Sequence, residues 1–492
     1  MLICMNPFVS LMAATFLQQG GNRGFLIYIG KGCEFVEFDE MMERINELYS
    51  QRNISELKKY INEINPADIA QLLENVFDER ERVFLFRLLT KENAADTFVE
   101  FDGDTQENLI IAFSDTELKE VLDEIYIDDA ADIIEEMPAT IVKRILKNTD
   151  PETREAINTI LKYPEDSAGS IMTPEFVDLK KDMTVEDAFK RIRRTGLDKE
   201  TIYTCYVTDA SRHLIGVTTV KELLLSDSDD VIEEFMETNV ISINTLDDRE
   251  TATRTLSKYD FLALPVVDME NRLVGIITVD DAIDVIQEEN TEDIQKMAAI
   301  TPTDTPYLKT SVIDLWKKRI PWLMLLMISA TLTSQILTTF ENKLLQASVL
   351  TAFIPMLMGT GGNSGGQSSA MIIRAISLDE VGFKDIFKVM WKEFRTGVIS
   401  GFSLAVVCFV KLILFDRIVL GNDALSFTVC IVISLTILVE TICAKIIGST
   451  LPIIAKKMGL DPAVLANPFI TTISDVVSLL VYIGFAVLIL HL

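Results

Sequence analysis

The pattern of apolar and polar positions divides the 492-residue chain into a helical front part, a mixed middle and an apolar end. Over residues 41–165, apolar positions recur at helical spacing. An Ala-Asp-apolar helix start recurs within this stretch, in the segments 66–74, 92–100 and 128–136. Repetition of one short helical unit is typical of stacked-helix arrays. The pattern therefore predicts an acidic, superhelical α-helical N-domain over 41–165.

A second repeat follows, in which short strands alternate with helices. The segment 207–222 reappears 59 residues later as the segment 266–281. Each copy predicts a strand, a helix, two further strands and a second helix. Tandem units of this kind resemble a pair of CBS domains, here over 166–228 and 229–280. The resemblance implies one pseudo-symmetric α/β module.

CBS pairs often bind adenine nucleotides, so the resemblance raises the question of an ATP site. Thr278 and Asp281 form the Thr-x-x-Asp ending that is associated with ribose binding. The first copy ends in Glu222 instead, so we expect at most one such site. A purely structural CBS pair stays an open alternative.

An acidic helix is predicted after the second copy, over residues 280–297. Its acids at 281, 284, 288 and 292 are three or four residues apart and therefore share one face. Like charges stacked in this way destabilise a helix unless cations offset them. Thr-Pro pairs at 301–302 and 305–306 then mark a linker. We therefore expect a connecting helix and linker over 281–310 that attracts cations.

The last part of the chain reads as a membrane domain over residues 316–492. Uncharged or nearly uncharged segments of membrane-spanning length recur in it. They predict five transmembrane helices, at 320–340, 348–376, about 394–415, about 424–448 and 469–492. Lys and Arg gather before the first helix, between the second and third, and between the fourth and fifth. Counting these charges predicts a multi-pass cell-membrane protein with its N-terminus in the cytoplasm and its C-terminus outside.

The second of these segments is interrupted by small and polar residues. It contains five glycines between Gly359 and Gly366, together with Asn363 and Gln367. Such residues stand at membrane depth where they line a cavity or a pore, or where small residues let helices pack closely. Packing explains the glycines but not the two amides on adjacent turns. We therefore expect a pore wall, with ligand oxygens from the glycine-freed backbone and from Asn363.

Asp475 is the only charged residue between positions 469 and 492. An unpaired Asp at the centre of a membrane helix costs about 2.5–3.5 kcal/mol on insertion scales, so a retained one is expected to be functional. Pairing with Lys445 or Lys411 is the alternative. Glu440 is the rival intramembrane acid, and it reads as structural because it is predicted near a helix end with Lys445 one turn onward.

Charge is distributed unevenly along the chain. Residues 1–309 hold 63 of the 74 acidic and 31 of the 45 basic residues, so they carry a net charge of −32, whereas the rest of the chain carries +3 and the whole chain −29. An acidic surface of this strength excludes nucleic acid as a partner and attracts cations. Six cysteines without metal-ligand spacing read as free thiols of a reducing compartment, and two histidines make a zinc or histidine-built catalytic centre untenable.

These observations favour Mg²⁺ as the ion at Asp475. Magnesium keeps several of its waters and needs only one or two carboxylates, whereas a calcium or transition-metal cage requires more ligands. One Asp per chain suits a hydrated ion best if two chains meet on a two-fold axis. Residues 1–40 lack the basic start of a signal peptide and read as a non-native or mis-assigned extension.

The motif Pro355-x3-Gly359-x-Gly361-Gly362-Asn363-x-Gly365-x-Gln367, the apolar end, the CBS pair and the acidic N-domain together resemble the MgtE magnesium channel/transporter family. The resemblance covers about residues 41–492. It implies a homodimer without enzymatic activity, whose pore is lined by the second and fifth membrane helices. By motif position, it implies pore magnesium contacts at Asp475, Asn363 and Asn467, and a possible loop site at Asp461.

The resemblance also implies that cytosolic Mg²⁺ regulates the channel, by bridging acids of the N-domain, the CBS pair and a plug helix. The matching acids are Asp128, Asp132, Asp248, Glu250, Asp260, Asp281, Asp284, Glu289, Glu292 and Asp293. Bound Mg²⁺ would hold these parts together and shut the pore, so uptake would be under negative feedback. Alternatives are a broader Co²⁺ or Mn²⁺ transporter, a nucleotide-sensing CBS membrane protein, and an intramembrane enzyme that uses Asp475 with Glu440 or Asp461.

Overall fold

The structure, a computed structural model, describes residues 38–303, 305, 307–341, 348–464 and 467–491. The expected extension over 1–40 therefore lies outside the described residues, except for its last three. The chain forms two compact units, one ending at Ile283 and the other running from Asp284 to Leu492.

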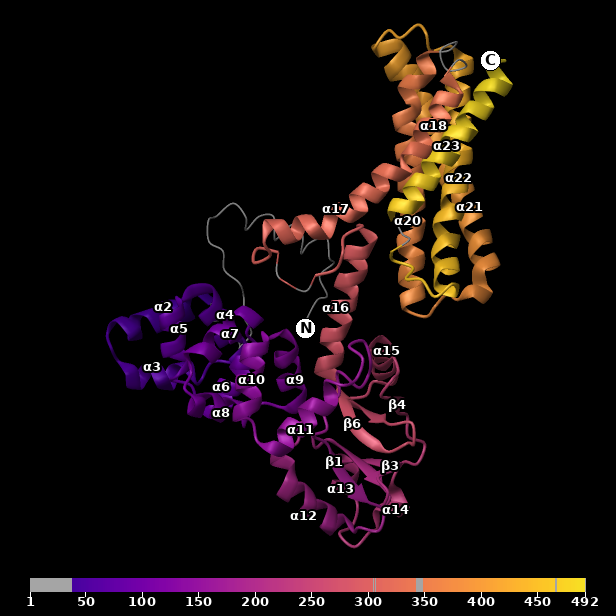
Figure 1. The fold of residues 1–492 in the computed structure, drawn as a ribbon. Coiled ribbons are helices and arrows are strands. Elements are labelled where there is room, and N and C mark those ends of the chain that lie inside the picture. Colours follow the sequence, from indigo (N-terminus) through magenta and orange to yellow (C-terminus); the bar gives the residue numbers. More distant parts are fainter. Residues whose placement is uncertain (1–37, 304, 306, 342–347, 465–466, 492) are drawn as a thin grey trace, which may run out of the picture. The chain divides into compact units, whose positions relative to one another are not determined.

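Short helices build the first part of the first unit (Figure 1). They are α2 (Phe38–Ser50), α3 (Ile54–Ile61), α4 (Pro66–Val76), α5 (Glu79–Phe86), α6 (Lys91–Val99), α7 (Gly103–Ala112), α8 (Asp115–Leu122), α9 (Ile127–Glu136), α10 (Ala139–Asn148) and α11 (Pro151–Ile160). Most begin at a polar cap, such as Asp102, whose carboxylate accepts from Thr105 N, and Ser114, which forms a capping box with Glu117. The three repeated cassettes each fall on a helix, α4, α6 and α9. The predicted helical N-domain is confirmed.

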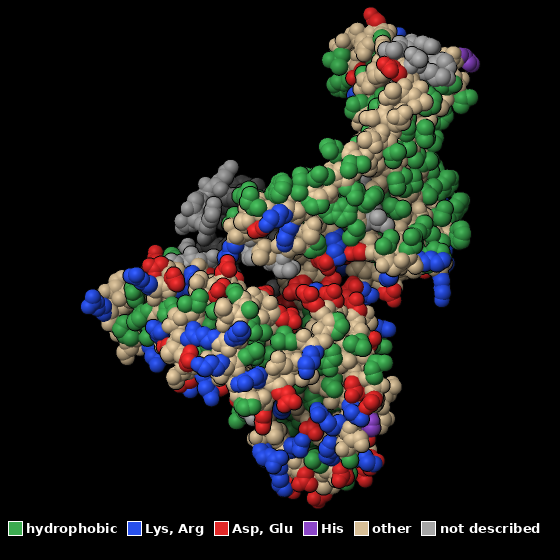
Figure 2. Space-filling model, in the orientation of Figure 1, with side chains coloured by type: hydrophobic (Ala, Val, Ile, Leu, Met, Phe, Trp, Pro, Cys, Tyr) green, Lys and Arg blue, Asp and Glu red, His purple; other side chains and the backbone are tan. Residues whose placement is uncertain are grey.

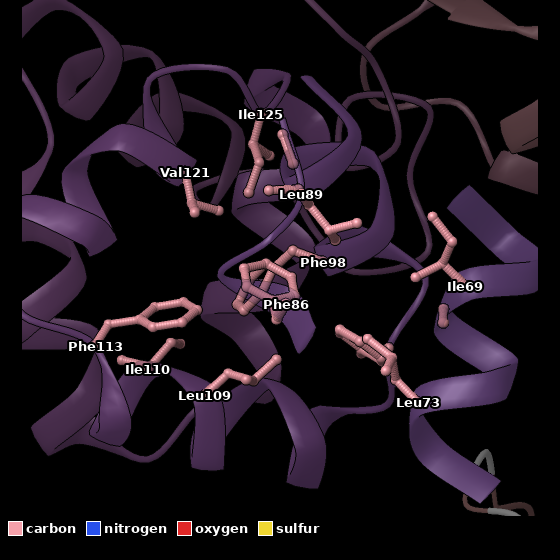
Figure 3. Close-up of a cluster of buried hydrophobic side chains, with 14 of the residues drawn as sticks. Ile69, Leu73, Phe86, Leu89, Phe98, Leu109, Ile110, Phe113, Val121 and Ile125 are labelled. Carbon is pink, nitrogen blue, oxygen red and sulfur yellow. The ribbon is translucent and has the colours of Figure 1, made fainter. Parts of the chain in front are cut away.

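Aromatic side chains lie at the centre of this helical array (Figure 3). The rings of Phe86 and Phe113 are 5.4 Å apart, and that of Phe98 is 6.3 Å from each. Burying these side chains, each worth about 1.5–3 kcal/mol, holds helices that are individually too short to be stable in water.

Two sheets of three strands follow, in the predicted order of elements. The first copy comprises β1 (Val177–Lys180), α12 (Val185–Thr195), η1 (Gly196–Asp198), β2 (Thr204–Thr208), β3 (Leu214–Thr219) and α13 (Val220–Leu225), followed by α14 (Ile232–Phe235). The second comprises β4 (Ile243–Asn244), α15 (Arg249–Tyr259), β5 (Ala263–Val267), β6 (Leu273–Thr278) and α16 (Val279–Met297). In each sheet the first strand runs parallel to the second and the second antiparallel to the third.

The two copies pack through their third strands and the turns before them. Leu214 N donates to Asn271 O and Leu273 N donates to Arg212 O, at 3.1 and 2.9 Å. Gly216 and Gly275 occupy equivalent positions, where a Cβ would lie 2.6 and 2.7 Å from the sulfur of a methionine. The predicted CBS pair, with its pseudo-symmetry, is confirmed.

The second unit is a set of long apolar helices. They are α17 (Val312–Ser329), α18 (Thr331–Thr339), η2 (Ser348–Phe353), α20 (Ile354–Ser377), η3 (Phe383–Asp385), α21 (Ile386–Lys411), the π-helix η4 (Leu412–Val419), α22 (Phe427–Lys457) and α23 (Asn467–Leu490). Figure 2 shows a mostly hydrophobic surface over this unit, whereas charged side chains are interspersed over the first.

Among the described residues, four segments are long and apolar enough to cross a membrane: Val312–Thr339, Phe383–Val419, Phe427–Lys457 and Phe469–Leu490. The helix α20, with 24 residues, is not one of them. Its Gly, Ser, Asn and Gln residues make it less apolar than its neighbours. Five membrane helices therefore stay a prediction, and the structure supports a multi-pass membrane domain.

Candidate functional site

The glycine-rich segment is a continuous part of α20, and this corrects one expectation. The helix runs from Ile354 to Ser377 without a break, so the backbone carbonyls of the glycine run lie within a regular helix. The prediction that a freed backbone supplies ligand oxygens is wrong. Glycine permits irregular backbone but does not impose it, and neighbouring helices hold this segment helical.

One face of α20 uses its glycines for close packing. A Cβ on Gly361 would lie 2.6 Å from Ser478 Oγ of α23, and one on Gly365 would lie 2.7 Å from Ile470 Cγ2. On α22, a Cβ on Gly448 would lie 2.2 Å from the carbonyl oxygen of Gly365. Small residues let membrane helices approach this closely. The packing explanation is therefore right for these glycines.

The opposite face of α20 carries the amides. Gly359, Asn363 and Gln367 are four residues apart, so they share one face, and all three are exposed. A Cβ on Gly359 would meet nothing within 4 Å. We call Gly359, Asn363 and Gln367 the amide stripe. Exposed amides on a helix packed among apolar helices belong against water or another protein surface rather than lipid.

Asp475 lies on α23, the helix that packs against α20. It is half-buried, and its neighbour Ser474 is buried against the α20 glycines. Asp475 has no ion pair with Lys445 or Lys411 among the described residues, and Lys411 pairs instead with Asp416 at 2.7 Å. Asn467 begins α23, but its side chain lies outside the described part of the structure.

Glu440 differs from its predicted position. The helix α22 continues to Lys457, so Glu440 lies near its middle rather than near an end. Its side chain is fully buried, and no described residue lies in hydrogen-bond geometry to its carboxylate oxygens. Lys445 is also buried and forms no ion pair with it among the described residues. The sequence predicted the end of this helix near residue 448, whereas the helix continues to Lys457.

A second site lies in the first unit, where acids of α9 meet acids of the CBS pair. Asp128 and Asp129 begin α9, and the charges of Asp281, Asp280, Glu200 and Glu175 act on them. Glu175 also accepts a hydrogen bond from Ile127 N at 3.0 Å. We call these six residues the acidic cluster: Asp128, Asp129, Glu175, Glu200, Asp280 and Asp281.

Three carboxyls of the acidic cluster, those of Asp128, Asp129 and Glu200, have raised pKa values. Burial, and then the charge of Asp281, raises the pKa of Asp129 to about 7 and that of Glu200 to about 8. The same two causes raise the pKa of Asp128 well above its usual range. Asp128 Oδ1 and Glu200 Oε2 are buried without a hydrogen-bond partner among the described residues. A bound cation would offset both the free-energy cost of burying these carboxylates and the repulsion between them.

The sequence found part of this cluster. It placed Asp128 and Asp281 in one site, and the structure brings them together. It missed Asp129, Asp280, Glu175 and Glu200. The two glutamates carry no sequence signal, since they precede β1 and follow η1 and meet α9 only in the folded chain. Asp132, on the same helix as Asp128 and Asp129, is exposed. No group of three or more His, Cys, Asp or Glu within the described ranges has metal-binding geometry, so a directly ligated ion would require these carboxylates to converge further.

Three predicted acids of the second CBS unit have structural contacts. Asp248 caps α15 by accepting from Glu250 N at 2.8 Å, and Glu250 forms an ion pair with Arg254. Asp260 ends the same helix with a left-handed φ of 55°. In addition, the carboxylate of Asp281 accepts a hydrogen bond from Thr278, so the residues of the expected ribose site contact each other.

The remaining predicted acids lie on α16 and in the segment before α23. Asp284 is exposed, whereas Glu289, Glu292 and Asp293 are half-buried. Asp461 accepts from Ala463 N at 2.7 Å and pairs with Lys296 at 2.7 Å. Asp461, which was predicted as a possible magnesium ligand, therefore pairs with the ammonium group of Lys296.

The order of these parts along the chain defines the class of protein. Three protein-family models match the chain: the MgtE intracellular N domain over residues 64–166, the CBS domain over 168–229 and 232–288, and MgtE, a divalent cation transporter, over 354–485. A helical array, a CBS pair and a membrane domain of this kind form a divalent cation transporter, not an enzyme.

The chain is similar to curated proteins along nearly its whole length. It is 35% identical over 457 residues to the magnesium transporter MgtE of Thermus thermophilus, covering 92% of this chain and 99% of that protein. It is 34% identical to the magnesium transporter MgtE of Bacillus subtilis, over 92% and 98% of the two chains. The chain belongs to the MgtE family, and the predicted resemblance is confirmed.

Two solved structures are similar to the front part of the chain. The soluble part of a magnesium transporter is 30% identical, with a TM-score of 0.48, and covers 51% of this chain and 99% of its own. The cytosolic domain of the Mg²⁺ channel MgtE in complex with ATP is 34% identical, with a TM-score of 0.48, and covers 50% and 99%.

Proposed function

We propose that this chain carries Mg²⁺ across the cell membrane as a homodimer and that cytosolic Mg²⁺ closes the pathway. The N-terminus would lie in the cytoplasm and the C-terminus outside. The division into N-domain, CBS 1, CBS 2, connecting helix and pore domain at 41–165, 166–228, 229–280, 281–310 and 316–492 belongs to the same proposal.

The amide stripe on α20 is the observation that carries the transport proposal. It stands exposed on a helix whose other face is packed against α22 and α23, and Asp475 lies on α23 beside that packed face. Amide oxygens and a carboxylate bind hydrated Mg²⁺ through its waters. Asn363 and Asp475 would be the principal contacts, with Asn467 at the mouth of the pathway.

The same exposure supports a homodimer. An exposed amide stripe is unfavourable against lipid, whereas a second copy related by a two-fold axis would face it with an identical stripe. Each copy would then contribute one Asp475 to a shared pathway. Crosslinking of single-cysteine variants at Gln367 is expected to give a covalent dimer, and a crosslink yield no higher than that of a cysteine at Phe402, which is exposed on α21, would argue against this arrangement.

Flux measurement in liposomes tests the transport proposal. Purified protein with Asp475→Ala is expected to lose Mg²⁺ flux, whereas Asp423→Ala, which removes an exposed loop acid, is expected to keep it. Normal flux through Asp475→Ala would refute the proposal. Competition with Co²⁺ and Mn²⁺ in the same assay decides the alternative of a broader divalent transporter.

The acidic cluster supports regulation by Mg²⁺. At an effective dielectric constant of 20, two carboxylates about 4 Å apart repel by about 4 kcal/mol, enough to bias a domain equilibrium when several pairs act together. Bound Mg²⁺ would remove this repulsion and favour a closed state. The regulatory acids would be those named from the family resemblance, joined by Asp129 and Glu200.

Neutralising the acids of α16 tests this regulation. The triple variant Glu289→Gln, Glu292→Gln and Asp293→Asn is expected to weaken closure by cytosolic Mg²⁺ while leaving flux at low Mg²⁺ intact. Channel currents recorded with increasing cytosolic Mg²⁺ measure this. Unchanged inhibition would remove these acids from the regulatory mechanism without affecting the transport proposal.

Nucleotide binding at the CBS pair is a second candidate. It rests on the Thr278–Asp281 hydrogen bond, which places a hydroxyl and a carboxylate together as a ribose diol requires. Asp281 would then serve both ATP and the acidic cluster. Thr278→Ala is expected to weaken ATP binding in equilibrium dialysis, and unchanged binding would exclude this site.

A further inference from the structure

The first CBS unit contains a cavity of about 370 Å³ whose lining is basic, although the protein as a whole is strongly acidic. Arg191, Lys199 and Arg212 line it together with one acid, Asp178. Pro174, Phe176 and Leu273 form its apolar wall. This volume is within the range of small-molecule pockets. None of Thr219, Glu222, Thr278 or Asp281 lines it, so it is separate from both Thr-x-x-Asp/Glu endings.

One cation of this cavity, Arg191, is held in a defined position. Arg191 Nε donates to the backbone oxygen of Asp178 at 2.6 Å, and its guanidinium also pairs with the Asp178 carboxylate. Beside them, Lys180 Nζ donates to Thr208 Oγ1 at 2.7 Å. A guanidinium fixed by one acid keeps further N–H donors for a ligand. The lining carries three positive charges and one negative charge, so it favours an anion.

The internal repeat shows that the fold does not need these charges. Thr184 is the N-cap of α12 and Asp248 is the N-cap of α15. Arg191 and Thr255 each lie seven residues after the cap of their helix, so these two residues correspond. Strand register matches Thr208 with Val267. By the same correspondence, Asp178 matches Ser242 and Lys180 matches Asn244. The charges are therefore a property of the first copy alone.

Arg212 adds a second argument from the same comparison. Its backbone adopts φ 69°, and the matching turn of the second copy has Asn271 at φ 60°. Asn tolerates this left-handed conformation, whereas Arg adopts it less readily. Lys199 also has no counterpart, because the connection from α12 to β2 is longer than that from α15 to β5. An Arg at an unfavourable position and a Lys in an added segment both face one cavity.

We propose that this cavity is a binding site for a small phosphorylated anion. Arg191 and Arg212 would bind the phosphate oxygens by paired N–H donors, and Lys199 would add a third charge. The apolar wall leaves room for a further group, so the ligand is either a nucleotide or an inorganic polyphosphate. This site is independent of the magnesium pathway and of the Thr278–Asp281 site.

Titration of the full-length protein in detergent with pyrophosphate and with AMP tests the proposal, in EDTA so that no magnesium complex forms. The variants take the residue of the second copy: Arg191→Thr and Arg212→Asn. Each is expected to weaken pyrophosphate binding at least about tenfold, as loss of a charge-assisted hydrogen bond implies. Arg194→Thr, which removes an exposed charge from the same helix outside the cavity, is expected to change it less than about twofold.

Three outcomes decide the proposal. Binding that is lost in Arg191→Thr and Arg212→Asn, retained in Arg194→Thr and restored in Arg212→Lys establishes the site. AMP binding that is tighter than pyrophosphate binding and unaffected by Thr278→Ala identifies a nucleotide, whereas pyrophosphate binding alone identifies a polyphosphate. Absence of binding of either probe, or an equal loss in Arg194→Thr, overturns the proposal. Thermal melting of each variant shows that the fold is retained, which the second-copy residues favour.

Discussion

Lys296 Nζ lies 2.7 Å from Asp461 Oδ2 and 2.6 Å from Glu292 Oε1, so one ammonium group joins α16 to the segment that precedes α23. Burial by itself would lower the pKa of Lys296, but the hydrogen bonds to Asp461 and Glu292 outweigh it and raise this pKa. The contact continues in apolar packing, because Met297 lies against Ile373 and Ala463. Lys296 thus occupies the position of a cation between two carboxylates.

Lys296→Gln is expected to make this contact depend on Mg²⁺. Without the ammonium group, Asp461 and Glu292 repel each other until a divalent ion offsets their charge. Hydrogen exchange of residues 290–300 should rise about tenfold in EDTA and fall again with Mg²⁺. Lys317→Gln, which breaks an exposed pair with Asp314, serves as the control and should not change this exchange. Magnesium-independent exchange in Lys296→Gln would contradict the prediction.

Replacement of glycine by alanine in the membrane domain is expected to have opposite effects on stability at Gly448 and at Gly359. Gly448→Ala is expected to destabilise the helix packing by about 1–3 kcal/mol, because its Cβ would meet the backbone oxygen of Gly365 at 2.2 Å. Gly359→Ala has open space around it and should be neutral or stabilising by up to about 1 kcal/mol. Melting of the purified protein in detergent measures both. Equal effects would show that close packing at Gly448 is unimportant.

The acidic cluster predicts a stability that falls as pH rises. Asp128, Asp129 and Glu200 have raised pKa values in the folded protein, so the folded state binds more protons than the unfolded state between about pH 4 and pH 8. Stability is therefore greatest at the acid end of this range and decreases as Asp129 and Glu200 ionise. In EDTA the melting temperature of the first unit should drop by at least about 3 °C from pH 5.5 to pH 8.

Magnesium should reverse this loss at pH 8 and have little effect at pH 5.5, because it competes with protons for the same carboxylates. Asp129→Asn with Glu200→Gln should remove both the pH dependence and the magnesium effect. Asp182→Asn, outside the cluster, is the control. A magnesium effect of equal size at both pH values would contradict the prediction.

Glu440 predicts a gain in stability with a loss of activity. A fully buried carboxyl that neighbours the charge of Asp475 and has, among the described residues, only the Ser478 hydroxyl to interact with disfavours the fold, so Glu440→Leu is expected to raise the melting temperature by about 2–4 °C. Flux is expected to fall in the same variant, because it removes an intramembrane carboxylate that interacts with Asp475. Ser434→Ala, which removes a buried hydroxyl of α22 that interacts with Cys408, is the control for flux. A melting temperature below that of the parent protein would show that Glu440 has a stabilising partner.

The sequence by itself determined the order of domains and the candidate ion. Helical spacing, the strand repeat and long uncharged segments are local patterns, and they predicted the helical array, the CBS pair and the membrane domain. Asp475 was found because one charge in an apolar segment is visible without any tertiary contact. Asn363 and the glycines were found by their motif, but their division between a packed face and an exposed face was not.

Only the tertiary structure decided which residues meet. Asp129, Glu175 and Glu200 join the acidic cluster because α9 and the CBS pair come together, and Lys296 reaches Asp461 over 165 residues of chain. The glycine segment stays helical because its neighbours α22 and α23 fill the space that side chains would need. Local patterns report burial along one element, whereas charge pairing and close approach depend on distances between elements that no local pattern contains.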